Sequence, residues 1–503
     1  MSGVVGQALL VAVLAVPAVG AAVVAALRHD RAARLVGTVA AGLTLLAALP
    51  LVAGGDNGGS GPDPSPAVRP WHQVDLPWVP GLDLRLHLGV DGISWPLVVL
   101  TALLTLLCCG YTLWKVPSGG SGRALVALLL VVEVGILGTF LALDLVLFFV
   151  FFEVVLLPMY AIIVGWGGPD RHRAARKFAL YTLFGSVLLL VGVLVVVTAA
   201  GTADIVALTG GTGLARGPQL AAFTLLALAF AVKSPLWPLH SWLPDAHTQA
   251  PTVGSVILAG VLLKMGTYGL IRVAVGVAPE GAEWAAPVLG VLAVAAILVG
   301  SLVCLAQTEL KRLIAYSSVG HMGFVLLGVA TLTGTGLRAA LIGNIAHGII
   351  TGLLFFLAGA IKDRAHTGDL AELSGLRETA PRLAGLLGFA AVASLGLPGL
   401  AGFWGEAFAV VAAVRVGGPL WLTLAVLAAL GGALTAAYLL RLLRQVTHGR
   451  ASSPVARLGP GVARAELLTW APLVLLTLAV GLAPILVLGV AQAPVDALLP
   501  GRP

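Results

Sequence analysis

The chain has 503 residues, a mean hydropathy of +1.03, 59% hydrophobic residues and only 10% charged residues. This composition supplies too little polar surface for a soluble globular protein, and that class is excluded. The apolar segments are about twenty residues long, which suits helices crossing a ~30 Å hydrocarbon core and not the short alternating strands of a membrane barrel.

Apolar spans follow one another along the whole chain, and each is expected to form a transmembrane helix. About fourteen are predicted, at residues 4–26, 35–53, 92–114, 124–142, 145–165, 178–200, 219–240, 251–273, 285–306, 313–332, 337–361, 382–413, 418–440 and 467–490. The first span has no small-residue cleavage site and leads into "RHDRAARL", so it is interpreted as a membrane anchor and not as a signal peptide. The expected fold class is an all-α polytopic membrane protein.

The basic residues of the loops predict an orientation. Loops on one side hold 20 Lys and Arg residues, whereas loops on the other side, with Arg272 among them, hold 7. Positive charge accumulates in short cytoplasmic loops, so both termini are predicted to be non-cytoplasmic in a bacterial inner (cytoplasmic) membrane. The net charge of +7 is explained by this bias and gives no reason to expect a nucleic-acid partner. The two remaining basic residues, Lys233 and Lys264, lie inside predicted helices.

Five ionisable residues fall inside the spans and each needs a physical reason. They are Glu133, Glu153, Lys233, Lys264 and Glu406. A charge near the bilayer centre costs roughly 2.5–3.5 kcal/mol, so these groups are expected to face one another or water inside the bundle. For Glu133 a structural and a functional role are equally supported, whereas for Glu153, flanked by bulky apolar residues, the functional role is favoured.

Lys233 stands directly before a predicted helix break. Pro235 and Pro238 remove backbone hydrogen bonds to the carbonyls of Ala231 and Ser234. Free carbonyls are natural partners of an ammonium group, and an interrupted helix at membrane depth must line a cavity or be covered by protein. The break is therefore predicted to solvate the cation and to leave the lysine able to load and release a proton.

Two further residues extend this hypothesis toward a relay. His240 lies seven residues after Lys233, the spacing of one face in an intact helix, and is a candidate relay group although a lone histidine is usually structural. Lys264 is in the middle of its span, and Gly260 and Gly266 are predicted to allow a close approach of neighbouring helices.

Two histidines farther along the chain suggest that a hydrophilic track continues. His321 and His347 both lie in apolar spans, with Ser317, Ser318 and Asn344 as polar neighbours. Each histidine alone is better explained as structural, and the group together favours a track.

The twelfth span repeats the pattern of the seventh. Pro398 interrupts it among several glycines and Glu406 follows. Discontinuous helices are thus predicted near 233–238 and 396–406. One broken helix with an ionisable group in each half is typical of transporters built from inverted repeats, and the family resemblance given below implies two inverted-repeat bundles.

No feature of the sequence indicates a bound cofactor or metal in this chain. Cys108, Cys109 and Cys304 lie in apolar spans without C-x-x-C spacing, and no nucleotide-binding glycine motif is found. The cysteines are interpreted as small core residues.

Five segments together resemble a known family. In chain order they are "LDLVLFFVFFEVVLLPMY", "VKSPLWPLHSWLPDAHTQAP", "LLKMGTYGLIR", "ELKRLIAYSSVGHMGF" and "LPGLAGFWGE". They resemble the proton-translocating antiporter-like subunits of respiratory complex I, over nearly the whole chain. This resemblance implies N-terminal helices 1–3 at 1–120, a first antiporter-like repeat at 121–275, a second at 276–443, and a C-terminal loop and helix 14 at 444–503.

The resemblance also implies a chain of proton-transfer residues at the membrane mid-plane. Its members would be Glu153 paired with Lys233, then His240, Lys264, His321, His347 and finally Glu406. The implied activity is that of a subunit of a proton-translocating NADH:quinone oxidoreductase, a translocase driven by quinone reduction elsewhere. FMN, iron–sulfur clusters and quinone would belong to partner subunits, and the implied partners are other membrane-arm subunits, especially those of L and N type, with lipid around them.

Glu406 separates the branches of this family, because the L-type and N-type subunits carry lysine at that position while the M-type subunits carry glutamate. Two alternatives remain open. One is a subunit of a multisubunit sodium/proton antiporter or of a membrane-bound hydrogenase. The other is a membrane scaffold in which buried charges only fix helix packing.

Overall fold

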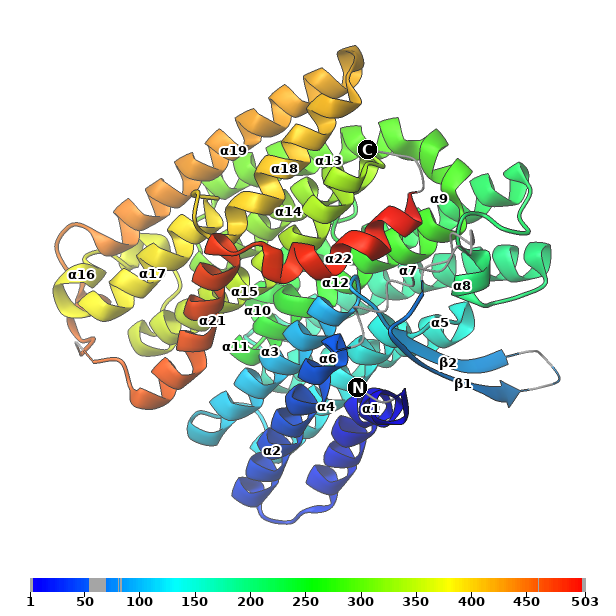
Figure 1. Cartoon of the computed structure of the whole chain (residues 1–503). Coiled ribbons are helices and arrows are strands. Elements are labelled where there is room, and N and C mark those ends of the chain that lie inside the picture. Colours follow the sequence, from blue (N-terminus) through cyan, green and yellow to red (C-terminus); the bar gives the residue numbers. More distant parts are fainter. Residues whose placement is uncertain (1–2, 54–68, 80, 82–83, 460, 500–503) are drawn as a thin grey trace.

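The computed structural model describes residues 3–53, 69–79, 81, 84–459 and 461–499. In this part of the chain the fold is a bundle of helices with one antiparallel hairpin at its edge, formed by strands β1 (His72–Val79) and β2 (Leu84–Val90) (Figure 1).

The first half of the chain forms the helices α1 to α12. Their bounds are α1 Gly3–Ala26, α2 Asp30–Ala48, α3 Trp95–Trp114, α4 Gly122–Leu141, α5 Leu145–Val154, α6 Leu156–Trp166, α7 Arg171–Ala200, α8 Ile205–Leu208, α9 Arg216–Lys233, α10 Trp242–Gln249, α11 Thr252–Ile257 and α12 Leu263–Gly269. Three short segments accompany them: the 3-10 turn η1 (Leu49–Val52) and the π-helical segments η3 (Leu258–Leu262) and η4 (Leu270–Val275).

The second half forms α13 to α22. Their bounds are α13 Pro279–Ala306, α14 Leu310–Ala330, α15 Gly334–Ala365, α16 Leu376–Thr379, α17 Pro381–Ser394, α18 Ala401–Val416, α19 Gly418–Thr447, α20 Ser453–Ala456, α21 Arg464–Leu482 and α22 Ile485–Leu498, with the 3-10 turn η5 (Leu370–Glu372) before α16.

Twelve of the described helical segments are long and apolar enough to cross a membrane. The two predicted spans missing from this count are 219–240 and 382–413. These are the spans predicted to be discontinuous, and each is split: α9 ends at Lys233, and α17 and α18 are separated by residues 395–400. The all-α polytopic class and both helix breaks are therefore confirmed.

An isolated β-bridge between two acidic residues, one of which also caps a helix, occurs at both ends of the bundle. An isolated β-bridge joins Asp144 to Asp204, just before α5 and α8, and a second bridge joins Glu309 to Asp369, just before α14 and η5. In each case the first acidic side chain also caps its helix, since Asp144 accepts hydrogen bonds from backbone N–H groups of α5 and Glu309 accepts one from α14. Figure 1 places α8 and α16 at opposite ends of the molecule. The same device at opposite ends is the geometry that an inverted repeat produces.

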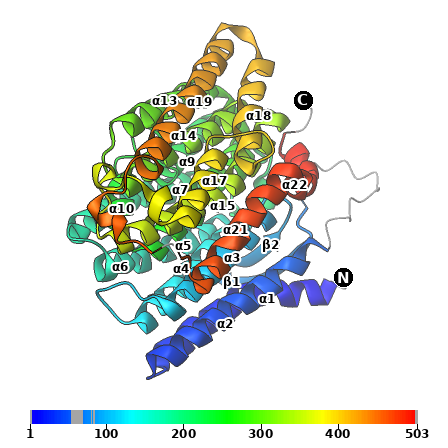
Figure 2. The ribbon, with the colours of Figure 1, turned by 90° about the vertical axis from the view of Figure 1, so that its left-hand side faces the viewer.

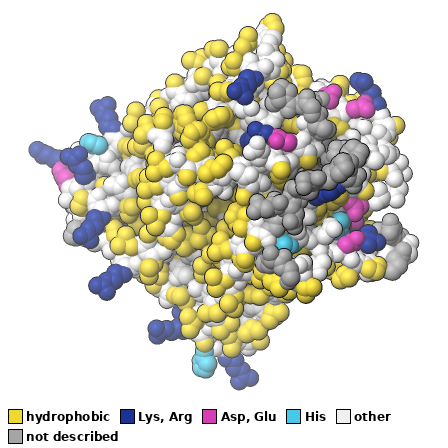
Figure 3. Space-filling model, in the orientation of Figure 1, with side chains coloured by type: hydrophobic (Ala, Val, Ile, Leu, Met, Phe, Trp, Pro, Cys, Tyr) yellow, Lys and Arg dark blue, Asp and Glu magenta, His cyan; other side chains and the backbone are white. Residues whose placement is uncertain are grey.

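The outer surface is apolar and the innermost helices do not reach it. Hydrophobic side chains cover the middle of the face in Figure 3, while many Lys and Arg side chains lie along its left and lower margin, which is called here the basic end. Figure 2 shows α1, α2 and α21 on the periphery. By contrast, the most apolar windows of Thr252–Val275 and Gly334–Ala365 are 100% buried, and that of Leu310–Ala330 is 89% buried. The buried side chains of Lys264, His321 and His347 on these three segments are therefore shielded from lipid.

The hairpin lies where the sequence predicted only a loop, between the second and third spans, and part of that loop lies outside the described residues. His87 of β2 bonds Asp204 at 3.0 Å and so ties the hairpin to the turn before α8. Burial raises the pKa of Asp204, but the hydrogen bond from His87, the backbone N–H groups of Ala207 and Val206 and the charge of His87 together outweigh it, and the pKa lies below its usual value.

Candidate functional site

Two of the predicted site residues are in direct contact at the centre of the bundle. Lys264 Nζ lies 2.6 Å from His347 Nδ1, and the lysine also donates to the carbonyl of Ala259 in the turn before it. Lys264 belongs to α12, between the π-helical segments η3 and η4, while His347 belongs to α15. π-Helical turns are rare and are frequent at functional sites. The lysine is fully buried, so its charge depends on these few partners.

Asn344 stands one helical turn before His347 and extends this polar contact. Thr267, which follows Lys264 by three residues, donates its hydroxyl to Asn344 Oδ1 at 2.9 Å. Asn344 Nδ2 and His347 Nε2 are buried without a hydrogen-bond partner within the described chain. Buried polar atoms of this kind are the usual sites of bound water.

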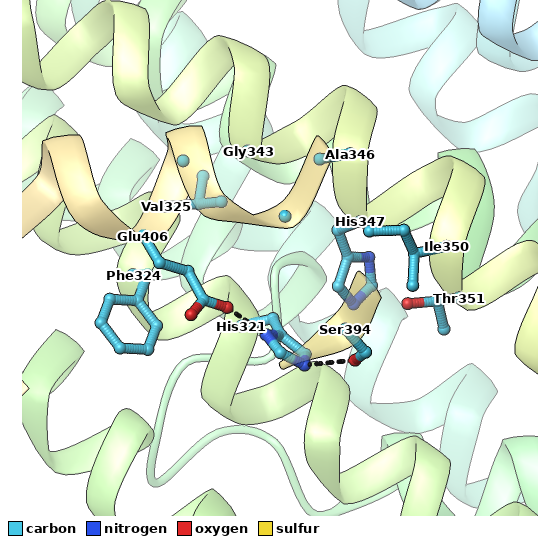
Figure 4. Close-up of a pocket in the computed structure, with 12 residues that line it drawn as sticks. His321, Phe324, Val325, Gly343, Ala346, His347, Ile350, Thr351, Ser394 and Glu406 are labelled. Carbon is cyan, nitrogen blue, oxygen red and sulfur yellow. Dashed lines mark hydrogen bonds and ion pairs between the residues drawn. The ribbon is translucent and has the colours of Figure 1, made fainter. Parts of the chain in front are cut away.

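A second contact joins His321 of α14 to Glu406 of α18. His321 Nδ1 lies 2.7 Å from Glu406 Oε1, and its other ring nitrogen, Nε2, lies 3.0 Å from the hydroxyl of Ser394 at the end of α17 (Figure 4). One histidine therefore has a polar partner on each side of the break in the twelfth span.

The two contacts face each other across a small cavity. The ring centres of His321 and His347 lie 5.8 Å apart, and no hydrogen bond joins the two rings, since His321 bonds Glu406 and Ser394 and His347 Nε2 has no partner among the described residues. A cavity of about 30 Å³ lies between them, lined also by Ser394, Thr351 and Glu406. This volume accommodates about two water molecules. A row of groups that can exchange protons thus runs from Lys264 through His347 and His321 to Glu406.

Glycines bring the helices of this row close together. A Cβ atom at Gly405, beside Glu406, would lie 2.6 Å from the Cα of Gly343 on α15, so α18 can pack there only without a side chain. A Cβ atom at Gly266 would lie 2.8 Å from the carbonyl of Phe230 and the amide of Ser234, at the break after α9. The predicted close approach at Gly266 is therefore confirmed.

Glu153 and Lys233 form a separate group and do not pair directly. Glu153 Oε1 accepts a hydrogen bond from the hydroxyl of Ser186 on α7. Lys233 Nζ lies 4.6 Å from the centre of the Phe152 ring, a cation–π contact. Lys233 has no hydrogen bond or ion pair within the described residues. The two charges therefore act on each other through space and not through a shared hydrogen bond.

The break after α9 is closed in a different way from that predicted. The carbonyl of Ala231 accepts from the backbone N–H of Leu236 at 2.9 Å, and that of Val232 accepts from the indole of Trp242 at 2.9 Å. Lys233 donates to neither the Ala231 carbonyl nor the Ser234 carbonyl among the described residues, so the expectation that freed carbonyls solvate this lysine is wrong. The lysine is left with an aromatic face as its partner.

An interruption that the sequence analysis missed lies beside Glu153. The fifth span is divided at Val155 into α5 and α6, so Glu153 stands in the last turn of α5. Pro158 was the available signal, because it removes a hydrogen bond to the carbonyl of Val154.

His240 and Glu133 do not join either group. His240 lies in the break before α10, its ring is 6.2 Å from that of Tyr316, and its Nδ1 has no hydrogen-bond partner within the described chain. No contact brings His240 to Lys233 or Lys264 in the described part of the structure. Glu133 on α4 is fully buried, with both carboxyl oxygens unpartnered among the described residues.

The count of buried cations also needs correction. Arg272 was assigned to a loop, but it lies in η4, is 2% exposed and forms an ion pair with Asp91. Lys311, assigned to the loop before α14, is 5% exposed and donates to the carbonyl of Ala250 at 3.1 Å. The composition of the loops does not show that these two basic residues are buried while neighbouring basic residues are exposed to solvent.

Sequence reasoning also missed the partners that hold the site residues. Ser186, Ser394 and Thr267 contact Glu153, His321 and Asn344 from other helices. For each of these three residues, the only sign in the sequence was one hydroxyl side chain within an apolar span. His247 was missed as well, although it lies in the segment "VKSPLWPLHSWLPDAHTQAP" that carries the family resemblance. It is fully buried and stacks on Phe355 with ring centres 4.5 Å apart.

Comparison with known proteins gives one family. Residues 142–431 match the family model described as NADH:quinone oxidoreductase/Mrp antiporter, transmembrane. Among curated proteins, the NADH-quinone oxidoreductase subunit M of Rhodobacter capsulatus is 40% identical over 501 residues, covering 96% of this chain and 94% of the relative.

Solved structures agree with this result. A chain of the respiratory complex I of Thermus thermophilus with bound NADH is 32% identical, with a TM-score of 0.85 over 97% of this chain and 99% of that one. A chain of the Mrp complex from Dietzia sp. DQ12-45-1b reaches the same TM-score of 0.85 over 99% of this chain and 98% of that one. Its identity is 24%, so this second likeness concerns the fold alone.

Proposed function

The chain belongs to the NADH:quinone oxidoreductase/Mrp antiporter transmembrane family, and from this membership we propose that it is a proton-translocating membrane-arm subunit of a NADH-quinone oxidoreductase. The observation that carries the proposal is the row Lys264, His347, His321 and Glu406, in which each member touches the next or faces it across a cavity with room for water. The chain contributes the proton path, and FMN, iron–sulfur clusters and quinone belong to partner subunits.

A proton moves along this row by short transfers. Lys264 gives a proton to His347 over the 2.6 Å contact, and water in the cavity carries it to His321. His321 passes it to Glu406 over the 2.7 Å contact. Neither histidine needs to move. His347 bonds Lys264 through Nδ1 and keeps Nε2 for cavity water, and His321 bonds Glu406 through Nδ1 and receives the proton at Nε2 through the Ser394 hydroxyl, which also lines the cavity.

The Glu153 and Lys233 group acts as the control element. Since no hydrogen bond joins the two side chains, a change in the charge of Glu153 reaches Lys233 only through the field, over the Phe152 ring. Conformational or charge changes caused by quinone reduction elsewhere would alter the charges of Glu153 and Lys233. The changed field of Lys233 would then favour or oppose proton release from Lys264.

The location and partners follow the same proposal. The chain lies in the bacterial cytoplasmic membrane with its basic end toward the cytoplasm and both termini on the other side, as the loop charges predict. Its neighbours are other membrane-arm subunits, among them those of L and N type.

A purification experiment tests the assignment. The tagged chain, extracted from its native membrane in mild detergent, should carry FMN, iron–sulfur absorbance and NADH-quinone activity with it. Redox-free membrane partners would contradict the proposal and favour a sodium/proton antiporter subunit. Transport that does not depend on sodium in the purified assembly would count against that alternative.

A further inference from the structure

A buried ion pair lies at the end of the bundle opposite to the basic end, which is called here the far end. It joins Arg272, in the last turn of η4, to Asp91, in the turn just before α3. The segment Thr252–Val275 begins at the basic end, where the carbonyl of Ala250 binds Lys311, so Arg272 lies near the far end of this segment. The two side chains of the pair are 2% and 3% exposed, which makes it the opposite of a solvated surface pair.

The same segment places Arg272 in line with Lys264. Tyr268 and Arg272 follow Lys264 by four and eight residues, which is the spacing of one helical face. The hydroxyl of Tyr268 donates to the carbonyl of Phe140 at 3.0 Å, and Tyr268 interacts electrostatically with both Arg272 and Asp91. At 1.5 Å per residue, Arg272 lies roughly 12 Å beyond Lys264 along the axis. A line of polar groups thus leads from Lys264 to the far end.

The pair at the end of this line does not exchange protons readily. Asp91 Oδ1 accepts hydrogen bonds from the backbone N–H groups of Ile93 and Ser94, both at 3.0 Å, and Oδ2 accepts from Arg272. The carboxylate is therefore fully occupied as an acceptor, and it compensates the buried guanidinium. A guanidinium has five donors, no acceptor, and keeps its proton in proteins. Arg272 is thus a fixed positive charge between Lys264 and the far end.

Helix α22 covers the pair from outside. Gly92, beside Asp91, lies so close to this helix that a Cβ atom would be 1.6 Å from the carbonyl oxygen of Val490. A Cβ atom at Gly276, directly after η4, would lie 3.3 Å from the side chain of Leu498. Figure 1 shows α22 lying across the bundle. The pair is therefore enclosed between the Lys264 segment and α22.

We propose that Arg272, held in place by Asp91, is a barrier that prevents protons at the far end from reaching Lys264. The inference rests on the proposed function, in which Lys264 passes its protons to His347. An open path between Lys264 and the far end would let protons return down their gradient without doing work. A fixed positive charge repels protons and does not relay them, which is how a channel arginine excludes protons. The row that ends at Glu406 then remains the route by which protons leave.

The main test measures passive proton conductance in proteoliposomes that hold the whole complex and receive no NADH. An acid pulse is applied outside, and a trapped pH dye reports the internal pH. Asp91→Asn combined with Arg272→Gln removes both charges, keeps hydrogen-bonding groups and leaves no unpaired buried charge. Asp75→Asn combined with Arg85→Gln neutralises an ion pair of the hairpin, with side chains 35% and 38% exposed, in the same way and is the control.

The conductance of the Asp91/Arg272 double variant should rise about tenfold over that of the unsubstituted complex, whereas the control should not change it. Adding Lys264→Met to the double variant should restore the low conductance, because the opened path leads to Lys264. A double variant as tight as the control overturns the inference. A leak that persists after Lys264→Met is added overturns it as well, because such a leak does not pass through Lys264.

The protons moved per NADH oxidised separate this result from the proposed function. The uncoupled NADH-quinone rate checks assembly, and Lys264→Met alone sets the level expected when this chain no longer translocates protons. If Lys264→Met lowers the ratio while the Asp91/Arg272 double variant stays tight, only the inference fails. If Lys264→Met keeps the normal ratio in the assembled complex, the proposed function fails and the inference falls with it.

A milder variant keeps the inference testable if the double variant fails to assemble. Arg272→Lys retains a cation beside Asp91, but a buried lysine can give up its proton whereas arginine does not. The passive conductance should therefore rise by a smaller factor, about threefold, and return to the unsubstituted value when Lys264→Met is added. An assembled Arg272→Lys complex that is as tight as the unsubstituted one would overturn the inference.

Discussion

The two broken helices hold their ionisable groups on opposite sides of the break and in contact with different partners. Lys233 is the last residue of α9, before the break, and among the described residues its ammonium contacts the face of Phe152 and forms no hydrogen bond. Glu406 comes after the break, in α18, and bonds His321 directly at 2.7 Å. Among the described residues the first group has no hydrogen-bonded route for a proton, whereas the second is the end of a hydrogen-bonded contact. Under the proposed function, the same backbone device therefore serves control in one half and conduction in the other.

Within the control group, the largest effect is expected from removing the cation. Lys233→Met should slow proton translocation by this chain about 10²-fold, the lower range for a positioned acid or base. Lys233→Arg is the matched variant, because arginine keeps the charge but does not give up its proton. If Lys233 only supplies a field, Lys233→Arg should retain most translocation, and a loss equal to that of Lys233→Met would place Lys233 in the conducting row.

A smaller effect is expected at the hydroxyl that holds Glu153. Ser186→Ala removes a hydrogen bond to a carboxyl group, about 1.5–3 kcal/mol, so translocation should fall roughly tenfold. Ser186→Thr keeps the hydroxyl and should behave like the unsubstituted chain. Equal rates for Ala and Thr would show that the orientation of Glu153 does not matter.

The corresponding hydroxyl of the conducting row should have a weaker influence. Ser394→Ala removes the hydrogen bond between the Ser394 hydroxyl and His321 Nε2, which is worth about 1 kcal/mol. Proton transfer should therefore be roughly fivefold slower, and the proton-to-electron ratio should fall accordingly. A loss larger than that of Ser186→Ala would reverse the contrast between the two halves. Stopped-flow measurement of vesicle acidification, with Ser394→Thr alongside, provides the comparison.

The smallest effect concerns the ring that faces Lys233. Phe152→Leu removes a cation–π contact of about 0.5–1 kcal/mol, which predicts a change of roughly threefold in translocation. Phe152→Tyr retains the aromatic face and is the control. A Leu variant indistinguishable from Tyr would mean that the ring only fills space.

Composition and helix-breaking residues were enough to predict the architecture. Span length gave the membrane class, and Pro235, Pro238 and Pro398 located both discontinuous helices because proline removes specific backbone bonds. The hairpin was not predicted, since its anchor, the contact of His87 with Asp204, joins residues 117 positions apart. The domain boundaries and the roles of the site residues stay predictions.

The sequence could predict the types of the site residues but not which of them contact one another. Buried charge in an apolar span is visible in sequence, so Lys264, His321, His347 and Glu406 were all named. Which of them touch depends on how α12, α14, α15 and α18 pack, and spacing along the chain carries no such information. His240 shows the error this causes, because the seven-residue spacing from Lys233 would place it on the same face only in an intact helix.

One measurement tests the conducting row most directly: the protons moved per NADH oxidised by the complex carrying Glu406→Gln, reconstituted in proteoliposomes. Glutamine can still bond His321 but cannot accept a proton. The ratio should fall to the level of Lys264→Met while the uncoupled NADH-quinone rate stays normal. An unchanged ratio in the assembled complex would contradict the assignment of this row as the proton path.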